Sequence, residues 1–260
     1  MKNQKKQKVQ KNTDTNHILI CGKHPVFTAI QLGRRKIIEV LVTQNSLPDL
    51  NNFLSKKSLR NIPIKVVDGQ FIENLVGRQQ IHQGIVLKAS KLPIKNQIDL
   101  LTELYEIEQG AKLPTLLLMD QISDPHNVGA IIRSAASFGV KKVVFCEHNA
   151  PPENSTIVKS SAGTIDFVDL YTVTNFNNLI EKLKKIGYWC IGLAGEGEAG
   201  LEKISEYKNI ALIVGSEGKG IRDLVKKNCD LLVRIEINKE VESLNASVAA
   251  AIALYEISRG

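Results

Sequence analysis

The chain has 260 residues, of which 43% are hydrophobic and 23% charged, a composition typical of a globular protein with one large domain or two smaller ones. It has no apolar stretch near the ~18 residues that a membrane helix needs, and its N-terminus lacks the apolar segment of a secretory signal. We therefore expect neither a membrane protein nor an exported one, and predict a cytoplasmic location.

The net charge of +7 is concentrated at the N-terminus. Five lysines lie within residues 1–15, and without them the chain carries 29 basic against 27 acidic residues. Residues 1–15 are therefore predicted to form a basic, disordered arm beside a nearly neutral body. Such arms often contact nucleic acid, although a merely solubilising role fits the composition equally well.

Residues 16–90 alternate between strand and helix patterns and predict a small α/β domain. The expected strands are 17–21, 36–43, 62–68 and 84–89, and the expected helices are 24–33, 47–59 and 70–77. Pro25 falls in the first turn of the first helix, and Gly33 ends it. Residues 91–113, with a proline near each end and a weakly helical acidic middle, are predicted to be a linker.

Residues 114–260 continue the alternation and predict a second α/β domain. Its expected strands are 115–120, 141–146, 166–171, 188–194, 210–215 and 230–237. Its expected helices are 127–139, 155–163, 175–187, a short one after residue 220, and 243–260. This pattern predicts a mostly parallel sheet with helices on both faces.

The cysteines predict reduced thiols and no metal site. All four lie far apart, without a CxxC pair. His17, Cys21 and His24 have a loose metal-ligand spacing, but no fourth ligand lies nearby. We interpret them as ordinary strand and turn residues.

Two glycine motifs resemble nucleotide sites and fail their requirements. In "GSEGKG", residues 215–220, Lys219 precedes a glycine, whereas a phosphate-binding P-loop needs Ser or Thr there. Gly195, Gly197 and Gly200 match GxGxxG after a strand. The stretch 201–209 leaves little room for the long helix that a dinucleotide fold requires. A nucleotide-dependent oxidoreductase is therefore only a weak alternative.

Three neighbouring strand ends instead predict a shared pocket. Residues 192–198, 215–220 and 235–247 each follow a predicted strand and are rich in glycine or polar residues. In an open parallel sheet, ligands bind beyond the carboxyl ends of the strands. Glycine allows a ligand to approach the main chain closely. We predict a ligand gripped by main-chain groups, with plain tight turns as the simpler alternative.

Three longer stretches carry a family resemblance. "MDQISDPHNVGAIIRSAASFGV", "IALIVGSEGKGIRD" and "VRIEINKEVESLNASVAAAIALYEI" resemble, in order and spacing, the three motifs of the SpoU (TrmH-type) RNA 2′-O-ribose methyltransferases. The resemblance covers residues 114–260. Residues 16–90, through "GKHPVFTAI", resemble the family's L30e-like substrate-binding domain. The subgroup most similar methylates a guanosine ribose in 23S ribosomal RNA.

The resemblance implies a fold, a cofactor and partners. The cofactor would be S-adenosyl-L-methionine, and the C-terminal domain a SPOUT-type parallel-sheet domain tied in a trefoil knot. The enzyme would act as a homodimer whose active sites draw on both subunits. Its substrate would be ribosomal RNA, with transfer RNA as the alternative. A non-catalytic RNA-binding module is the remaining alternative, and the intact motif residues argue against it.

The family's functional residues map onto this sequence position by position. The catalytic set implied is Asn127, Arg133, Glu217, Ser243 and Asn245, and the cofactor-binding set is Gly195, Gly215, Ile235 and Leu244. The family proposal gives Arg133 the removal of the 2′-hydroxyl proton. Arginine stays protonated in proteins, so a phosphate clamp is the easier role.

Each residue also has a simpler interpretation. Arg133 could be a solvated surface arginine, and Glu217 an exposed loop carboxylate. Ser243 and Asn245 could simply begin the last helix. Histidine is a common general base, but His126, beside a proline, is more often a turn residue.

Overall fold

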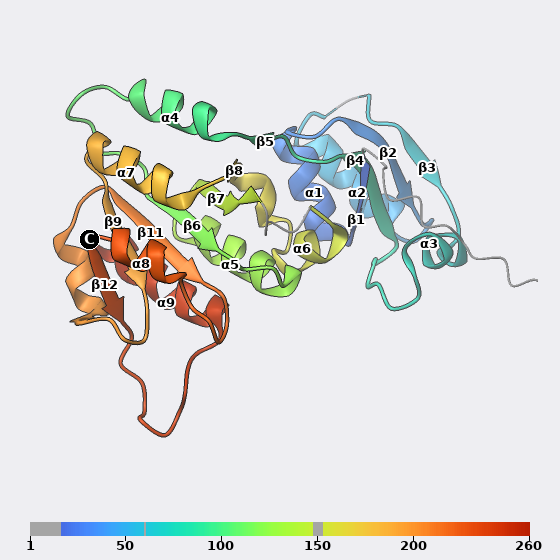
Figure 1. Ribbon diagram of the computed structural model, residues 1–260. Helices are drawn as coiled ribbons and strands as arrows, with labels where there is room; N and C mark the ends of the chain where they lie inside the picture. Colours follow the sequence, from blue (N-terminus) through green and yellow to red (C-terminus); the bar gives the residue numbers. More distant parts are fainter. Residues whose placement is uncertain (1–16, 60, 148–152) are drawn as a thin grey trace, which may run out of the picture.

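A computed structural model describes residues 17–59, 61–147 and 153–260 of the chain. The predicted basic arm lies outside the described residues. The rest forms two units, each with its own sheet (Figure 1): an N-terminal unit, residues 17–90, and a C-terminal unit, residues 91–260.

The N-terminal unit is a four-stranded mixed sheet in the order β1-β4-β2-β3. Its strands are β1 (His17–Cys21), β2 (Ile37–Val42), β3 (Ile64–Val66) and β4 (Ile85–Ser90). Its helices are α1 (Lys23–Leu32), α2 (Leu47–Lys56) and α3 (Gly69–Val76). Alternation along β4 buries Ile85 and Leu87 against α1 and α2, and Val86 against α3. The predicted alternation of strand and helix is thus confirmed, and the left-handed Gly33 ends α1 as expected.

The C-terminal unit is an eight-stranded sheet in the order β10-β12-β9-β11-β6-β7-β8-β5, in which all neighbours are parallel. Its strands are β5 (Ile94–Lys95), β6 (Leu116–Asp120), β7 (Lys142–Cys146), β8 (Asp169–Val173), β9 (Trp189–Leu193), β10 (Ala199–Gly200), β11 (Ile210–Gly215) and β12 (Leu231–Arg234). The central strands β6 and β11 are buried along their whole length, as expected for a sheet covered on both faces.

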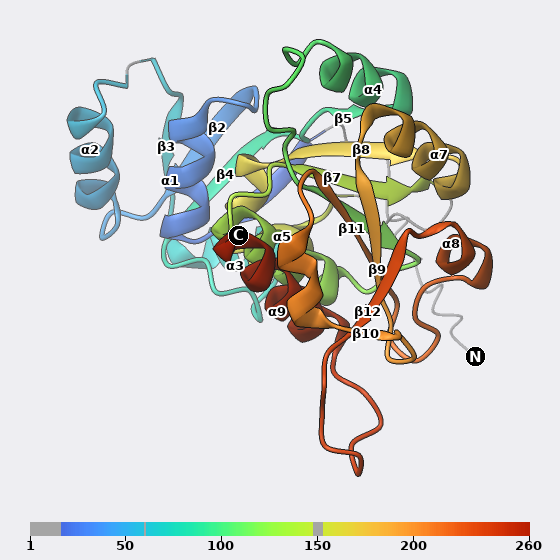
Figure 2. The same cartoon turned by 90° about the vertical axis from the view of Figure 1, so that its left-hand side faces the viewer.

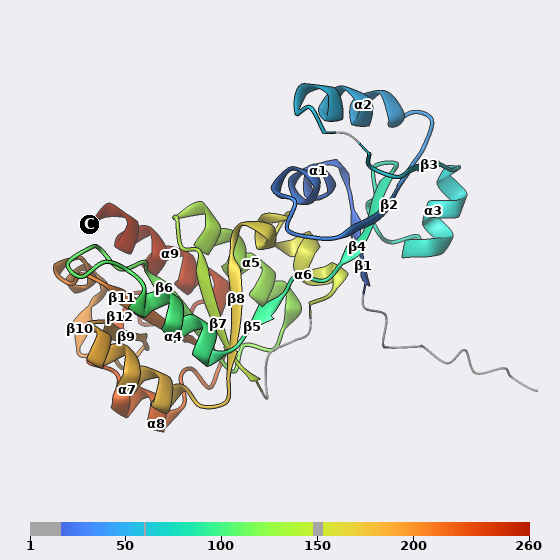
Figure 3. The same cartoon turned by 90° about the horizontal axis from the view of Figure 1, so that it is seen from above.

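Helices cover both faces of this sheet, as predicted (Figure 3). One face carries α5 (Pro125–Ser137), α6 (Ser155–Ser160) and α9 (Ala246–Arg259). The other carries α4 (Gln97–Tyr105), α7 (Phe176–Ile186) and α8 (Asp223–Asn228). Two 3-10 helices, η2 (Thr164–Phe167) and η3 (Leu201–Glu206), complete the unit. None of the helices in the described part of the chain has the length and apolar character that a membrane crossing needs.

The predicted linker contains regular structure. It includes β5, which extends the large sheet beside β8, and α4, which begins with a capping box between Asn96 and Asp99. Leu100 and Leu104 of α4 are buried against the sheet, and the Glu103 carboxylate accepts a 2.6 Å hydrogen bond from the Tyr171 hydroxyl. The two-residue β5 is too short to show a periodic pattern, and α4 corresponds to the weakly helical middle of the predicted linker.

Several predicted elements are shorter than expected; the strand expected over residues 62–68, for example, is only β3, Ile64–Val66. The strand expected from residue 166 begins at Asp169, because residues 164–167 form η2. The strand expected to reach residue 237 ends at Arg234. Residues 235–245 then form a loop that projects from the body before α9 begins at Ala246 (Figure 2).

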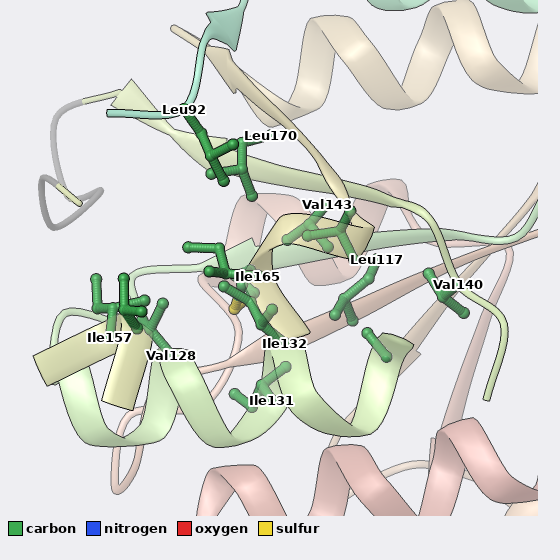
Figure 4. Close-up of a cluster of buried hydrophobic side chains, with 14 of the residues drawn as sticks. Leu92, Leu117, Val128, Ile131, Ile132, Val140, Val143, Ile157, Ile165 and Leu170 are labelled. Carbon is green, nitrogen blue, oxygen red and sulfur yellow. The ribbon is translucent and has the colours of Figure 1, made fainter. Parts of the chain in front are cut away.

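The two units are packed against each other. One hydrophobic cluster runs through both, with Val26 and Ile30 from the N-terminal unit and Val158 and Ile165 from the C-terminal unit. Figure 4 shows the C-terminal part of this cluster, where Leu92 lies beside Leu170 and Ile157 beside Val128. Polar contacts add to it at Arg35, described below. The N-terminal unit is therefore docked on the C-terminal unit rather than joined to it by the chain alone.

The docking contact centres on a buried arginine. Arg35, 4% exposed, donates to Glu153 at 2.6 Å and to Asp166 at 2.7 Å, and both of these residues are buried as well. Its neighbour Arg34 donates to the main-chain oxygen of Val168 at 2.7 Å. Buried charges persist only where they are paired and hydrogen-bonded, so this contact fixes how the two units meet.

Candidate active site

A pocket of about 530 Å³ lies at the carboxyl ends of β9, β11 and β12. Its walls come mainly from residues 193–196, 214–220 and 235–246, which are far apart in the sequence. These are the three strand ends that the sequence predicted to meet. The predicted site residues among its lining are Gly195, Gly215, Glu217, Ile235, Ser243 and Leu244.

The glycines give the pocket a main-chain wall. A Cβ at Gly215 would overlap the main-chain carbon of Gly220, because the loop doubles back on the end of β11. Two hydrogen bonds between Ser216 and Gly220, at 3.2 and 2.9 Å, close this turn. A Cβ at Gly195, in contrast, would meet nothing within 4 Å. Gly215 is therefore needed for the turn, whereas Gly195 leaves its main chain open to the pocket.

Three polar side chains from three different segments meet beside the pocket. Asn127 donates its amide to Glu217 at 3.1 Å, and Asn245 donates to Asn127 at 3.1 Å and also to Glu217. Asn127 lies in the first turn of α5, Glu217 in the loop after β11, and Asn245 immediately before α9. We call these three residues the amide–carboxylate cluster. It ties together the ends of all three sequence motifs.

Asn245 has a second contact. Its side-chain oxygen accepts hydrogen bonds from the main-chain N–H groups of Ser247, at 2.8 Å, and Val248, at 3.4 Å. It is therefore the N-cap of α9, as the simpler interpretation proposed. The side-chain oxygen of Asn245 thus caps the helix, and its side-chain nitrogen donates hydrogen bonds within the amide–carboxylate cluster.

Two cations contact the loop that follows β9, part of which lines the pocket. Lys226 of α8 forms an ion pair with Glu196, and both residues line the pocket. This hydrogen bond lowers the pKa of Glu196 below its usual value. Arg234 donates to the main-chain oxygens of Gly197 at 2.8 Å and Glu198 at 3.0 Å. These contacts are not predicted from the sequence. The only signal for them is that basic residues lie on the elements that follow each loop.

Arg133 is the predicted site residue that joins neither the pocket nor the cluster. It lies on the exposed side of α5, away from the buried Val128, Ile131 and Ile132. Within the described residues, its guanidinium has no hydrogen-bond or ion-pair partner. His126 is also exposed, and its main-chain N–H donates to the N-cap Asp124 at 3.1 Å. His126 thus occupies a helix-start position.

The other sites weighed from the sequence find no support. Across the described ranges, no group of three or more His, Cys, Asp or Glu side chains is placed to hold a metal ion. Burial raises the pKa of Cys21 to about 11, so its thiol stays protonated. After Gly200 the chain forms the six-residue η3 and then β11, so the GxGxxG stretch lacks the long helix of a dinucleotide site.

Comparison with known families gives two matches. Residues 114–255 match the SpoU rRNA Methylase family, and residues 19–94 match a family described as RNA 2′-O ribose methyltransferase substrate binding.

Full-length relatives agree with these matches. A 23S rRNA (guanosine-2′-O-)-methyltransferase RlmB from Xanthomonas campestris pv. campestris is 36% identical over 243 residues, which cover 92% of this chain and 95% of the relative. A putative TrmH family tRNA/rRNA methyltransferase, YacO from Bacillus subtilis, is 30% identical over 245 residues. The match covers 94% of this chain and 96% of YacO. The SpoU methyltransferase AviRb from Streptomyces viridochromogenes, solved with AdoMet, superposes with a TM-score of 0.76. It is 21% identical, and the match covers 94% of this chain and 90% of AviRb.

Proposed function

The chain belongs to the SpoU rRNA methylase family, and we propose that it transfers a methyl group from S-adenosyl-L-methionine to the ribose 2′-oxygen of a guanosine in 23S ribosomal RNA. The observation that carries this proposal is the convergence of three distant motif segments on one pocket beside the amide–carboxylate cluster. Relatives named for this reaction, alignable over most of both chains, support it.

The residues of the pocket fit the proposed cofactor. Its volume lies within the range of about 300–1,000 Å³ that is usual for pockets holding small ligands. Ile235 and Leu244 offer apolar surface for a purine ring, and the open main chain at Gly195 can read its polar edge. Glu217 and Lys219 bring both charges needed for an amino-acid head group. When bound, this cofactor supplies a methyl group already activated on a sulfonium sulfur.

The protein's task is then to place the ribose oxygen and take up its proton. Methyl transfer is an in-line displacement, so alignment supplies much of the rate enhancement. The amide–carboxylate cluster keeps the motif segments in register around the pocket. A guanidinium is suited to clamping a phosphate, so Arg133 would bind a phosphate of the substrate, which orients the ribose and offers an oxygen for the 2′-hydroxyl proton.

The position of Arg133 supports a homodimer. Because Arg133 lies outside the pocket of its own chain, it would act in the pocket of a partner subunit. Helix α9 exposes an apolar stripe of Val248, Ile252 and Tyr255, spaced to share one face. A second copy of the chain packed on α5 and α9 would cover this stripe and bring the two Arg133 side chains to opposite sites.

The N-terminal unit would present the RNA. Its match to a substrate-binding family and its compact mixed sheet support an L30e-like RNA-binding domain. The basic residues 1–15 would add non-specific attraction to phosphates. An enzyme that modifies ribosomal RNA would work in the cytoplasm, where ribosomes assemble.

We also propose that the C-terminal unit is knotted. Strand β11 lies between β9 and β6, and residues 235–246 return to share a pocket with residues 193–196. A knot there would depart from the general rule that chains do not thread their own loops. Mechanical stretching from both ends should give a final contour length shorter than that of the fully extended chain. A length equal to the full extension would contradict the knot.

Mass spectrometry of RNA nucleosides tests the activity directly. Cells without this chain should lose one 2′-O-methylguanosine from 23S ribosomal RNA, and the wild-type gene, but not a Glu217→Gln variant, should restore it. Loss from transfer RNA instead would support the alternative substrate. Unchanged modification of both RNAs, together with RNA binding by the purified chain, would support the non-catalytic module.

A further inference from the structure

A second polar contact lies beneath the loop that carries Glu217. Asp120, at the carboxyl end of β6, has a side chain with no exposed surface. It accepts hydrogen bonds from the main-chain N–H of Arg222 at 2.9 Å and from its Nε at 2.8 Å, and the second guanidinium nitrogen lies 2.7 Å away. One carboxylate thus holds both the main chain and the side chain of the same residue.

This contact closes the glycine loop at its far end. The loop leaves β11 at Gly215, which pairs with Asp120 in the sheet. It returns through Gly220 to Arg222, where the Asp120 carboxylate holds it again. Gly218 and Gly220 both have a positive φ, and this flexible stretch has few side chains that could fix it. Asp120 therefore anchors the loop at both ends.

The same aspartate also begins the connection to the first motif. Asp120 is followed by Gln121, whose φ of 58° turns the chain sharply toward α5 and Asn127. The segment bearing Asn127 and the loop bearing Glu217 therefore start from one buried carboxylate. The hydrogen bond between Asn127 and Glu217 depends on how these two segments lie relative to each other.

We propose that Asp120 and Arg222 are positioning residues for methyl transfer. They hold residues 216–220 in the conformation that forms the cofactor wall and places Glu217 against Asn127 and Asn245. The inference rests on the proposed function, because it assigns the loop to the cofactor. The Arg222 side chain is 38% exposed, so it contributes little as a filler of the core, and its effect is exerted through the carboxylate.

Calorimetric titration with S-adenosyl-L-methionine, at a temperature where every variant is folded, tests the proposal. Arg222→Met should weaken cofactor binding by ~10-fold or more and lower kcat further, since misplacing a site by about 1 Å can cost on the order of 100-fold. Arg222→Lys keeps the charge and should recover part of both. Asp120→Asn keeps one acceptor and should behave like Arg222→Lys. Lys203→Met, which removes an exposed ion pair with Glu206, is the matched control and should bind like the wild type.

The outcomes separate positioning from plain stabilisation. If the variants melt at lower temperature but bind the cofactor and turn over like the wild type while folded, the inference is wrong. If Arg222→Met does not fold, the split between cofactor KM and kcat in Arg222→Lys decides. Wild-type values for Arg222→Lys would then overturn the inference. Failure of the wild-type protein itself to bind the cofactor would overturn the proposed function instead.

Discussion

At the scale of single residues, Asn245 performs two structural tasks with one amide. Its oxygen caps α9, while its nitrogen donates to Asn127 and Glu217. Aspartate can perform the first task but not the second, because an ionised carboxylate only accepts hydrogen bonds. The two tasks can therefore be separated by substitution.

We expect Asn245→Asp to lose its activity but to lose less stability than Asn245→Ala, because Asp keeps the helix cap. Asp caps a helix about as well as Asn, but it would face the carboxylate of Glu217. Asn245→Ala should lose both activity and about 0.5–2 kcal/mol of unfolding free energy. Denaturant titration and a methyl-transfer assay measure the two effects. Part of the activity of Asn245→Asp should return at acidic pH, where a protonated Asp can donate. Equal stability loss in both variants would contradict the assignment.

Gly215 offers a second test at this scale. Gly215→Ala should abolish cofactor binding, because its methyl group would overlap the main chain of Gly220 and force the loop off β11. Gly69→Ala, in the N-terminal unit, meets nothing within 4 Å and serves as the control. Isothermal titration with the cofactor measures the difference. Wild-type affinity in Gly215→Ala would mean that the loop conformation is unimportant for binding.

At the scale of elements, helix α9 exposes a stripe of neighbouring apolar side chains along one face. Tyr255 is 52% exposed and touches Phe138 of the α5 end edge-on, at 5.8 Å between ring centroids. Val248 and Ile252 continue the stripe along the same face of α9. Adjacent apolar groups of this kind favour a protein interface over water.

Ile252→Glu should therefore convert a dimer into monomers and remove activity. Sedimentation velocity measures the first effect and a methyl-transfer assay the second. Ile98→Glu, on the exposed side of α4, is the matched control and should remain dimeric. Mixing inactive Arg133→Ala and Glu217→Gln proteins should restore part of the activity, because a mixed dimer has one complete site. A monomeric wild-type protein would contradict the proposal.

The elements also show which features a sequence can reveal. Long periodic segments such as α5 and α7 were predicted, as was the pocket, because parallel strands bring their carboxyl ends to one edge. Two-residue strands such as β5 and β10 carry no periodicity. Contacts such as Arg35 with Asp166, 131 residues apart, and Arg222 with Asp120, 102 residues apart, follow from tertiary folding alone. No local pattern marks them.

At the scale of the whole molecule, Arg35 determines how the two units are joined. Burial raises the pKa of Asp166, and the ion pair with Arg35 opposes that rise. Glu153 depends on the same guanidinium. The interface therefore places two buried carboxylates around one arginine.

We expect Arg35→Met to cost about 3–5 kcal/mol of unfolding free energy, since it leaves buried carboxylates unpaired. A carboxyl group whose pKa is raised by folding destabilises the fold as pH rises through that pKa. The loss should therefore be smaller at mildly acidic than at mildly alkaline pH. Urea denaturation at both pH values measures it. Arg259→Met, which removes an exposed pair with Glu256, should change little at either pH. A pH-independent loss would contradict this account.

The first elements of the C-terminal unit limit where the chain can be lengthened. Strand β5 closes the outer margin of the large sheet by pairing with β8, and α4 follows it directly. A Gly-Ser dipeptide inserted between Lys95 and Asn96 would displace Leu100 and Leu104 from their buried positions against the sheet and lower the melting temperature. The same insertion in the exposed turn at Gly110 would be absorbed without loss, since surface turns tolerate added residues. Near the start of the C-terminal unit, a position that should tolerate an insertion and one that should not therefore lie about fifteen residues apart.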